Sequence, residues 1–378
     1  MSETNRPIIL ILGPTAGGKT ALSIALAQSL PGGGEVISAD SMQVYRGMDI
    51  GTAKPPMAER DGVPHHLLDL VEPSEEGFTV DSWLEAADAA IADVRSRGKW
   101  PLIVGGTNLY VQALLHGLHF GPAPDEAVRE RFRAMDPVER RKRLEEVDPV
   151  SAARIHPHDE RRTVRALEVH AGAGRPMSEV QRDWTAVEPR EDALTIALDW
   201  PVEAINRRIN ARVRQMMDEG LADEVYRLMT GPGLGLQARQ ALAYRQIADV
   251  FEAAGVVRTG DAPNPQTRPQ ARPRADLQAD PQADPHADQK TGQNAAPNPL
   301  APHVPKDAVE QIKIRTRRYA KQQRTWLRRF RGLPRSYFLD AATNDPQAIH
   351  SQALKIIHQE AGLDPNGPSG HSSASFQP

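Results

Sequence analysis

The sequence predicts an α/β fold in which a parallel β-sheet is flanked by helices. Residues 8–12 form an apolar, β-branched run typical of a buried parallel strand, and a glycine-rich stretch and a helical pattern follow directly. Further short apolar runs alternate with helical patterns, at residues 35–38, 67–70, 101–104, 194–198 and 336–340. Such alternation favours parallel strands joined by helices. From residue 122 to residue 184 charged helical patterns replace the alternation, which indicates an all-helical lobe inserted into the core.

The glycine-rich stretch contains the strongest motif of the chain. It consists of Gly13, Pro14, Thr15, Ala16, Gly17, Gly18, Lys19 and Thr20. This order matches the phosphate-binding pattern of glycine, four residues, then Gly-Lys-Ser/Thr. Between a strand and a helix, such a loop points backbone N–H groups and a helix N-terminus at a phosphate. The core is therefore predicted to be P-loop NTPase-like, and a nucleotide triphosphate is the default ligand of the loop taken alone.

The bulk composition excludes several classes of protein. The chain has 378 residues, is 39% hydrophobic and carries a net charge of -3. It contains no cysteine, which excludes disulfides and thiolate metal sites and fits a reducing cytoplasm. The N-terminus lacks the pattern of a signal peptide, and no apolar run reaches the roughly 18 residues of a membrane span. We therefore expect a cytoplasmic protein without a membrane partner.

Polar residues follow two of the predicted strands, where α/β folds place their chemistry. Asp40 comes just after residues 35–38 and could ligate Mg²⁺, act as a general base or cap the next helix. Thr107 follows the glycine pair after residues 101–104, as a ligand contact or as a helix N-cap. Lys54 lies in a glycine-containing loop and is either within reach of a phosphate or solvated. The residues alone leave these alternatives open.

A long helical pattern at residues 202–229 carries paired arginines. Arg208 and Arg212 are four residues apart and share one face of the helix. Two guanidinium groups suit a diphosphate, because each can donate a pair of hydrogen bonds. Ion pairs with nearby acids such as Glu203 or Asp218 are the alternative.

Two segments are rich in basic residues. Arg161, Arg162 and Arg165 gather at the start of a helical pattern at residues 159–170. Residues 313–331 contain nine lysines or arginines, no acid and interleaved aromatic residues. Basic residues in such arrangements suit RNA phosphates. A solvated helical face, and docking of the C-terminal helix on the core, are the alternatives.

The chain is predicted to consist of six segments. Ten of its 32 prolines lie between residues 260 and 305, in a stretch too polar to offset its ordering entropy. We expect a P-loop core in two parts, an inserted all-helical RNA-binding lobe, a disordered Pro/Ala/Asp/Gln-rich linker, a basic helix that ends the core and a flexible tail. The predicted bounds are 1–121 and 191–258 for the core, 122–190 for the lobe, 259–306 for the linker, 307–362 for the basic helix and end of the core, and 363–378 for the tail.

Together the motifs resemble the tRNA dimethylallyltransferase family, also called tRNA isopentenylpyrophosphate transferases. The similar pieces run in family order over nearly the whole chain apart from the linker and the tail. They are residues 13–16 with residues 18–20, Asp40-Ser41 with Tyr45, residues 47–55, residues 104–107 with Leu109-Tyr110, Asp148-Pro149, residues 153–157, Arg162, residues 165–169, Tyr244-Arg245, Thr316-Arg317 and Ala320-Lys321.

The resemblance implies that the enzyme transfers a dimethylallyl group from its diphosphate to the exocyclic amine of the adenine just 3′ of the anticodon. Mg²⁺ is the implied cofactor. The loop would then hold the prenyl diphosphate rather than ATP, through Lys19 and its amides, and Thr20 would help to place Mg²⁺. Asp40 becomes the general base, and Arg212 with Arg208 completes the diphosphate site. Asp40, Thr20 and Arg212 are thus the implied catalytic residues.

The resemblance also implies the tRNA contacts. They are Asp40, Ser41, Met42, Gln43, Thr107, Arg129, Arg161, Arg162, Thr163, Val164, Arg165, Arg239, Tyr244, Arg245, Arg317 and Lys321. This chain departs from the family at Gly17, where serine is usual, at Ala243, where glycine is usual, and at Gln322, where arginine is common. A small-metabolite kinase with a P-loop and an adenylate isopentenyltransferase are the rival functions, and a monomer is expected.

Overall fold

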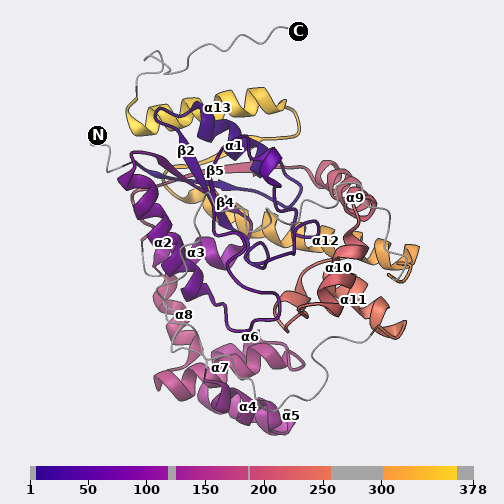
Figure 1. Ribbon diagram of the computed structural model, residues 1–378. Coiled ribbons are helices and arrows are strands. Elements are labelled where there is room, and N and C mark those ends of the chain that lie inside the picture. Colours follow the sequence, from indigo (N-terminus) through magenta and orange to yellow (C-terminus); the bar gives the residue numbers. More distant parts are fainter. Residues whose placement is uncertain (1–5, 118–124, 186–187, 257–300, 364–378) are drawn as a thin grey trace. The chain divides into compact units, whose positions relative to one another are not determined.

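The computed structural model describes residues 6–117, 125–185, 188–256 and 301–363 (Figure 1). The chain divides into two compact units, Met1–Val111 with Asp192–Pro378 and, between them in sequence, Gln112–Glu191. Most of the predicted linker, residues 259–306, and all but the first residue of the predicted tail, residues 363–378, lie outside the described residues. No helix of the described ranges is both long enough and apolar enough to cross a membrane.

A parallel six-stranded sheet forms the centre of the first unit and confirms the predicted α/β class. Its order is β3-β2-β4-β1-β5-β6, and every neighbouring pair is parallel. The strands are β1 (Ile8–Leu12), β2 (Gly34–Ala39), β3 (His65–His66), β4 (Trp100–Gly105), β5 (Ala193–Asp199) and β6 (Ser336–Asp340). Because β1 is central, the loop that follows it opens at the carboxyl edge of the sheet.

The third strand differs from the prediction of a strand at residues 67–70. The pairing with β2 covers only His65 and His66. Leu67 and Asp69 have φ values of 61° and 55°, in the left-handed region that a strand does not use. The apolar pattern therefore lies just after the strand, in a turn whose amides bond the carbonyls of residues 43 and 44.

Helices pack on both faces of the sheet. On one face α1 (Lys19–Ser29) lies beside α13 (Pro346–Ala361), as Figure 1 shows. Apolar residues from β1, β5 and these two helices form one core cluster. The helix α2 (Val80–Ser96) packs on β2 and β4, where the Trp83 ring stacks on Tyr110 at 4.5 Å between centroids. The helix α3 (Asn108–His116) follows β4.

A second core of the same unit is built from helices. Its elements are α9 (Val202–Asp218), α10 (Leu221–Thr230), α11 (Tyr244–Ala253) and α12 (Lys306–Leu327), with a short 3₁₀ turn at Ala238–Gln240. Two further 3₁₀ turns lie at Met57–Glu59 and Arg328–Gly332. The single helix predicted at residues 202–229 is two helices. Gly220 adopts a left-handed φ of 95°, which ends the first helix before the second begins. This core also contains Val44, Tyr45 and Met48, which follow the predicted base Asp40, and they pack with residues of α9 and α12.

The described part of the second unit contains only helices. They are α4 (Glu126–Ala134), α5 (Pro137–Val147), α6 (Pro149–Arg154), α7 (Glu160–Ala173) and α8 (Met177–Thr185). An aspartate side chain caps the N-terminus of each of the first four. Phe132, Leu144, Val164 and Leu167 form its small core. This agrees with the predicted insertion of charged helices into the core.

Candidate active site

The phosphate-binding loop connects β1 to α1 as predicted. Its turn needs two left-handed residues, Ala16 with a φ of 61° and Gly18 with a φ of 88°. Lys19 is the first residue of α1, and its ammonium donates to the carbonyls of Gly13 at 3.1 Å and Pro14 at 3.0 Å. The lysine therefore folds back over the loop, where a phosphate bound by the loop amides would meet it.

Gly17 fits this backbone because it lacks a side chain. A Cβ at this position would lie 2.7 Å from the Pro14 carbonyl oxygen, too close without a shift of the loop. The Gly17 carbonyl accepts a hydrogen bond from the Trp200 indole at 3.1 Å. The departure from the family's usual serine is thus matched by local packing.

Charges converge on the loop from two other elements. The pKa of Lys19 is lowered to about 8, mainly by burial and also by repulsion from Arg212, while the charge of Asp40 opposes both effects. Burial also lowers the pKa of Arg212, with Asp40 opposing it. Burial raises the pKa of Asp40, whereas the Met42 amide and the charge of Lys19 act against that rise. Two cations and one carboxylate therefore share a poorly solvated region.

Asp40 begins a turn rather than a helix. Its Oδ1 accepts a hydrogen bond from the Met42 amide at 2.9 Å, and residues 41–46 form turns. The suggested role as a helix cap is therefore wrong. The Thr107 hydroxyl accepts from the Ser41 amide at 3.0 Å and donates to the Ser41 hydroxyl at 3.4 Å. The Thr107 side chain therefore bonds the loop that follows Asp40. The Thr107 carbonyl accepts hydrogen bonds from the Tyr110 and Val111 amides at the start of α3.

The arginine pair of α9 faces the loop. Arg208 donates from Nε to the Ala16 carbonyl at 2.7 Å, and its guanidinium lies over the Trp200 ring at 4.9 Å from the centroid. Arg212 lies four residues further on the same face of α9, and its charge affects the pKa values of Lys19 and Asp40. Two predicted elements, the loop and the α9 face, therefore form one cationic site.

Sequence reasoning missed the contribution of α12 to this site. Gln323 accepts from the Thr15 amide at 2.8 Å and donates to the Gly106 carbonyl at 3.0 Å. Tyr319 donates to the same carbonyl at 3.5 Å. No local signal separates Gln323, which is buried, from its neighbour Gln322, which is exposed on the same basic helix.

The predicted tRNA contacts of the second unit differ in exposure. Arg161 and Arg162 are exposed at the start of α7. Arg165 pairs with Glu168 at 3.1 Å, and Arg129 pairs with the same glutamate at 3.2 Å. Thr163 and Val164, which were also predicted to contact tRNA, are buried inside the unit. Those two side chains offer no surface to RNA in this structure.

The predicted contacts of the first unit also fall into two groups. Arg245 and Lys321 are exposed. Arg317 donates to Asn210 at 2.7 Å, and Arg239 pairs with Asp249 at 2.8 Å. Tyr244 is fully buried and donates its hydroxyl to Glu224. A direct contact between the Tyr244 side chain and RNA therefore does not fit its position.

A resident metal site of protein carboxylates or histidines is not found in the described ranges. Thr20, the second residue of α1, carries a partly exposed hydroxyl beside the loop. One hydroxyl suits Mg²⁺ only when substrate phosphate oxygens and water supply the other ligands. The residues present fit a cation that arrives with a diphosphate.

Comparison with known proteins decides the family. The model of the family described as IPP transferase matches residues 43–275 and 285–330. The chain belongs to the IPP transferase family. The tRNA dimethylallyltransferase of Geobacillus thermodenitrificans is 39% identical over 360 residues, which cover 94% of this chain and 96% of that protein. That of Anaeromyxobacter dehalogenans is 49% identical over 245 residues, with coverage of 64% and 81%.

Solved structures of IPP transferase relatives agree with this assignment. A eukaryotic dimethylallyltransferase acting on tRNA matches with a TM-score of 0.70 and 26% identity, covering 96% of this chain and 82% of that one. The full-length tRNA isopentenylpyrophosphate transferase of Bacillus halodurans matches with a TM-score of 0.58 and 32% identity, covering 94% and 98%. The resemblance found in the motifs is thereby confirmed.

Proposed function

We propose that this protein transfers a dimethylallyl group from dimethylallyl diphosphate to the exocyclic amine of the adenine 3′-adjacent to the anticodon of tRNA. The observation that carries the proposal is the meeting of the loop, Arg212 and Asp40 in one poorly solvated site. A P-loop alone suits many phosphate ligands. A carboxylate facing the same cations suits a reaction that also needs a base.

The cationic groups bind and stabilise the leaving group. In the transfer, the C–O bond between the allylic carbon and the diphosphate breaks, and the electron pair stays on the diphosphate. Lys19, Arg212 and the loop amides stabilise the charge that develops there. Mg²⁺, held by Thr20 and by the diphosphate, would neutralise part of the same charge.

Asp40 handles the proton of the nucleophile. The adenine amine forms the new C–N bond, and one of its protons passes to the Asp40 carboxylate. An aromatic amine is a weak nucleophile, so a base placed at that nitrogen lowers the barrier. Burial raises the pKa of Asp40, which strengthens it as a proton acceptor.

The basic surfaces supply the RNA contacts in this proposal. The exposed Arg161 and Arg162 of α7, and the basic face of α12 that includes Lys321, suit the phosphates of a stem-loop. The target adenine has to leave its stack to reach a site beside a buried loop. A cytoplasmic monomer remains our expectation, because tRNA is the proposed substrate and nothing in the site calls for a second copy.

Labelled dimethylallyl diphosphate, Mg²⁺ and an anticodon stem-loop test the proposal. Label is expected in the stem-loop and not in the same RNA with guanosine at the target position. Free AMP and ATP serve as alternative acceptors, and ATP with small metabolites serves as the kinase assay. Label in AMP alone, or formation of ADP without label in RNA, would overturn the proposed function.

A further inference from the structure

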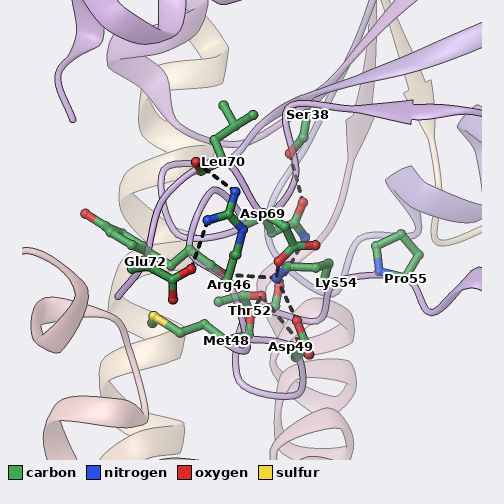
Figure 2. A network of polar contacts seen from close by, with 12 residues as sticks. Ser38, Arg46, Met48, Asp49, Thr52, Lys54, Pro55, Asp69, Leu70 and Glu72 are labelled. Carbon is green, nitrogen blue, oxygen red and sulfur yellow. Dashed lines mark hydrogen bonds and ion pairs between the residues drawn. The ribbon is translucent and has the colours of Figure 1, made fainter. Parts of the chain in front are cut away.

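Lys54 is a buried lysine whose ammonium contacts neither the phosphate-binding loop nor the solvent. Its side chain is 4% exposed. The ammonium donates to the Tyr45 carbonyl at 3.0 Å, to Asp49 at 2.6 Å and to Asp69 at 2.5 Å (Figure 2). An ammonium has three protons, so these acceptors saturate it. Both roles considered from sequence, a phosphate contact and a solvated lysine, are therefore wrong.

Two of these contacts fix the backbone that follows Asp40. The first is the direct bond to the Tyr45 carbonyl. The second runs through Asp69, whose amide donates to the Gln43 carbonyl at 3.2 Å. Next to it, the Val71 amide donates to the Val44 carbonyl at 3.0 Å. Lys54 thus links the turn at residues 67–71 to the loop that follows Asp40.

The Asp40 carboxylate depends on that backbone. It accepts from the Met42 amide at 2.9 Å, and the Gln43 amide also stabilises its charged form. The Gln43 side chain accepts from the Ser38 hydroxyl at 2.8 Å and donates to the Thr52 carbonyl at 3.2 Å, two residues before Lys54. A shift of residues 43–45 would therefore move the donors that aim Asp40.

We propose that Lys54 is a positioning residue for Asp40, acting through the backbone of residues 42–45 without touching either substrate. The inference rests on the proposed function, since it assigns Lys54 a part in the same proton transfer. Burying an ammonium between two carboxylates is costly compared with an apolar side chain of similar size. The geometry points to placement of the Tyr45 and Gln43 carbonyls as the reason for a charge here.

Arg46 offers a matched control on the same loop. It pairs with Glu72 at 2.9 Å, and its guanidinium also donates to the Leu70 carbonyl at 3.4 Å. Both partners of this ion pair are about two-fifths exposed, at 41% and 42%. The Arg46 side chain bonds no carbonyl of residues 40–45, so Arg46→Met removes a neighbouring cation without releasing that backbone.

The test compares Lys54→Met, Lys54→Met/Asp69→Asn and Arg46→Met in the labelled transfer assay, since asparagine tolerates the left-handed φ of 55° at residue 69. A small displacement of a catalytic group can cost about 100-fold, so the single-turnover rate constant of Lys54→Met is expected to fall about 30- to 100-fold. Affinities for prenyl diphosphate and for the stem-loop should stay within about threefold, because neither ligand touches Lys54. Arg46→Met should transfer label at the wild-type rate.

The double variant separates positioning from stability. Lys54→Met leaves Asp69 buried without a partner, whereas the double variant removes both charges and should recover the thermal midpoint. Its transfer rate should remain low, because the Tyr45 carbonyl has still lost its donor. Recovery of the rate together with the midpoint would overturn the inference, as would a loss of prenyl-diphosphate affinity at an unchanged rate. If Lys54→Met does not fold, the double variant decides alone. Failure of the wild-type protein to label RNA counts against the proposed function and is seen before any variant is compared.

Discussion

Replacing Lys19 with methionine should stabilise the ligand-free protein while abolishing its binding of diphosphate. The ammonium is poorly solvated and faces Arg212, so its pKa falls from 10.5 to about 8. A folded state that holds a group in an unfavourable charged form is less stable than one without the charge. The lysine is retained, in this view, because a bound diphosphate reverses its unfavourable surroundings.

The size of the effect follows from the pKa. Each unit of pKa corresponds to about 1.4 kcal/mol, so the lowering amounts to about 3 kcal/mol at neutral pH. Loss of the two hydrogen bonds to the Gly13 and Pro14 carbonyls opposes part of it. A net stabilisation of about 1–3 kcal/mol remains, which corresponds to a rise in Tm of about 2–6 °C for a domain of this class.

The sign of the pH dependence is fixed by the same shift. Between pH 8 and pH 10.5 the unfolded chain keeps a proton on Lys19 that the folded chain has lost. The stability contributed by this group therefore rises with pH across that window and is lost as the pH falls through about 8. This part of the rise should be absent in Lys19→Met.

Thermal unfolding with and without inorganic diphosphate provides the assay. Wild-type protein should gain stability from diphosphate, and Lys19→Met should begin higher and gain little. Lys355→Met, an exposed substitution on α13, is the control and should leave both values unchanged. A ligand-free Lys19→Met protein that unfolds several degrees below the wild type would refute this reasoning.

Three further predictions concern other parts of the chain. Asp40→Asn should lower the single-turnover transfer rate about 10²- to 10⁴-fold with unchanged RNA affinity, and normal turnover would remove Asp40 as the base. Arg317→Ala should weaken stem-loop binding and lower its salt slope by about 1, and a loss confined to prenyl-diphosphate affinity would contradict an RNA role. Ala243→Gly should raise the free energy of unfolding by about 1 kcal/mol in urea titration, because Ala243 has a φ of 72°, and a lower midpoint would show that its buried methyl group matters more.

The sequence was sufficient to predict those elements and site residues whose positions depend on local patterns alone. A β-branched run before Gly13 and an apolar face after Lys19 specify a strand, a turn and a helix without distant contacts. The position of Asp40 after β2 also follows from the rule that α/β sheets place chemistry at strand ends. The shared face of Arg208 and Arg212 follows from helical spacing alone.

Tertiary contacts account for what the sequence did not predict. The bond between Gln323 and the Thr15 amide joins residues 308 positions apart, and no local pattern encodes it. Lys54 has the sequence neighbourhood of a surface loop, but its side chain is buried and pairs with Asp69, which lies 15 residues further along the chain. Tyr244 lies beside the exposed Arg245, but the approach of Gly51 to its ring shows that it packs inside.

The coupling of the site charges bears on the timing of the reaction. In the free site Lys19 and Arg212 oppose the rise that burial imposes on the pKa of Asp40. In the proposed reaction a bound diphosphate would pair with both cations and add negative charge of its own, so their effect on Asp40 would be cancelled and its pKa would rise further. Asp40 therefore becomes a stronger proton acceptor when the prenyl donor is in place. In the proposed reaction, the groups that stabilise the leaving diphosphate would thus also set the strength of the base.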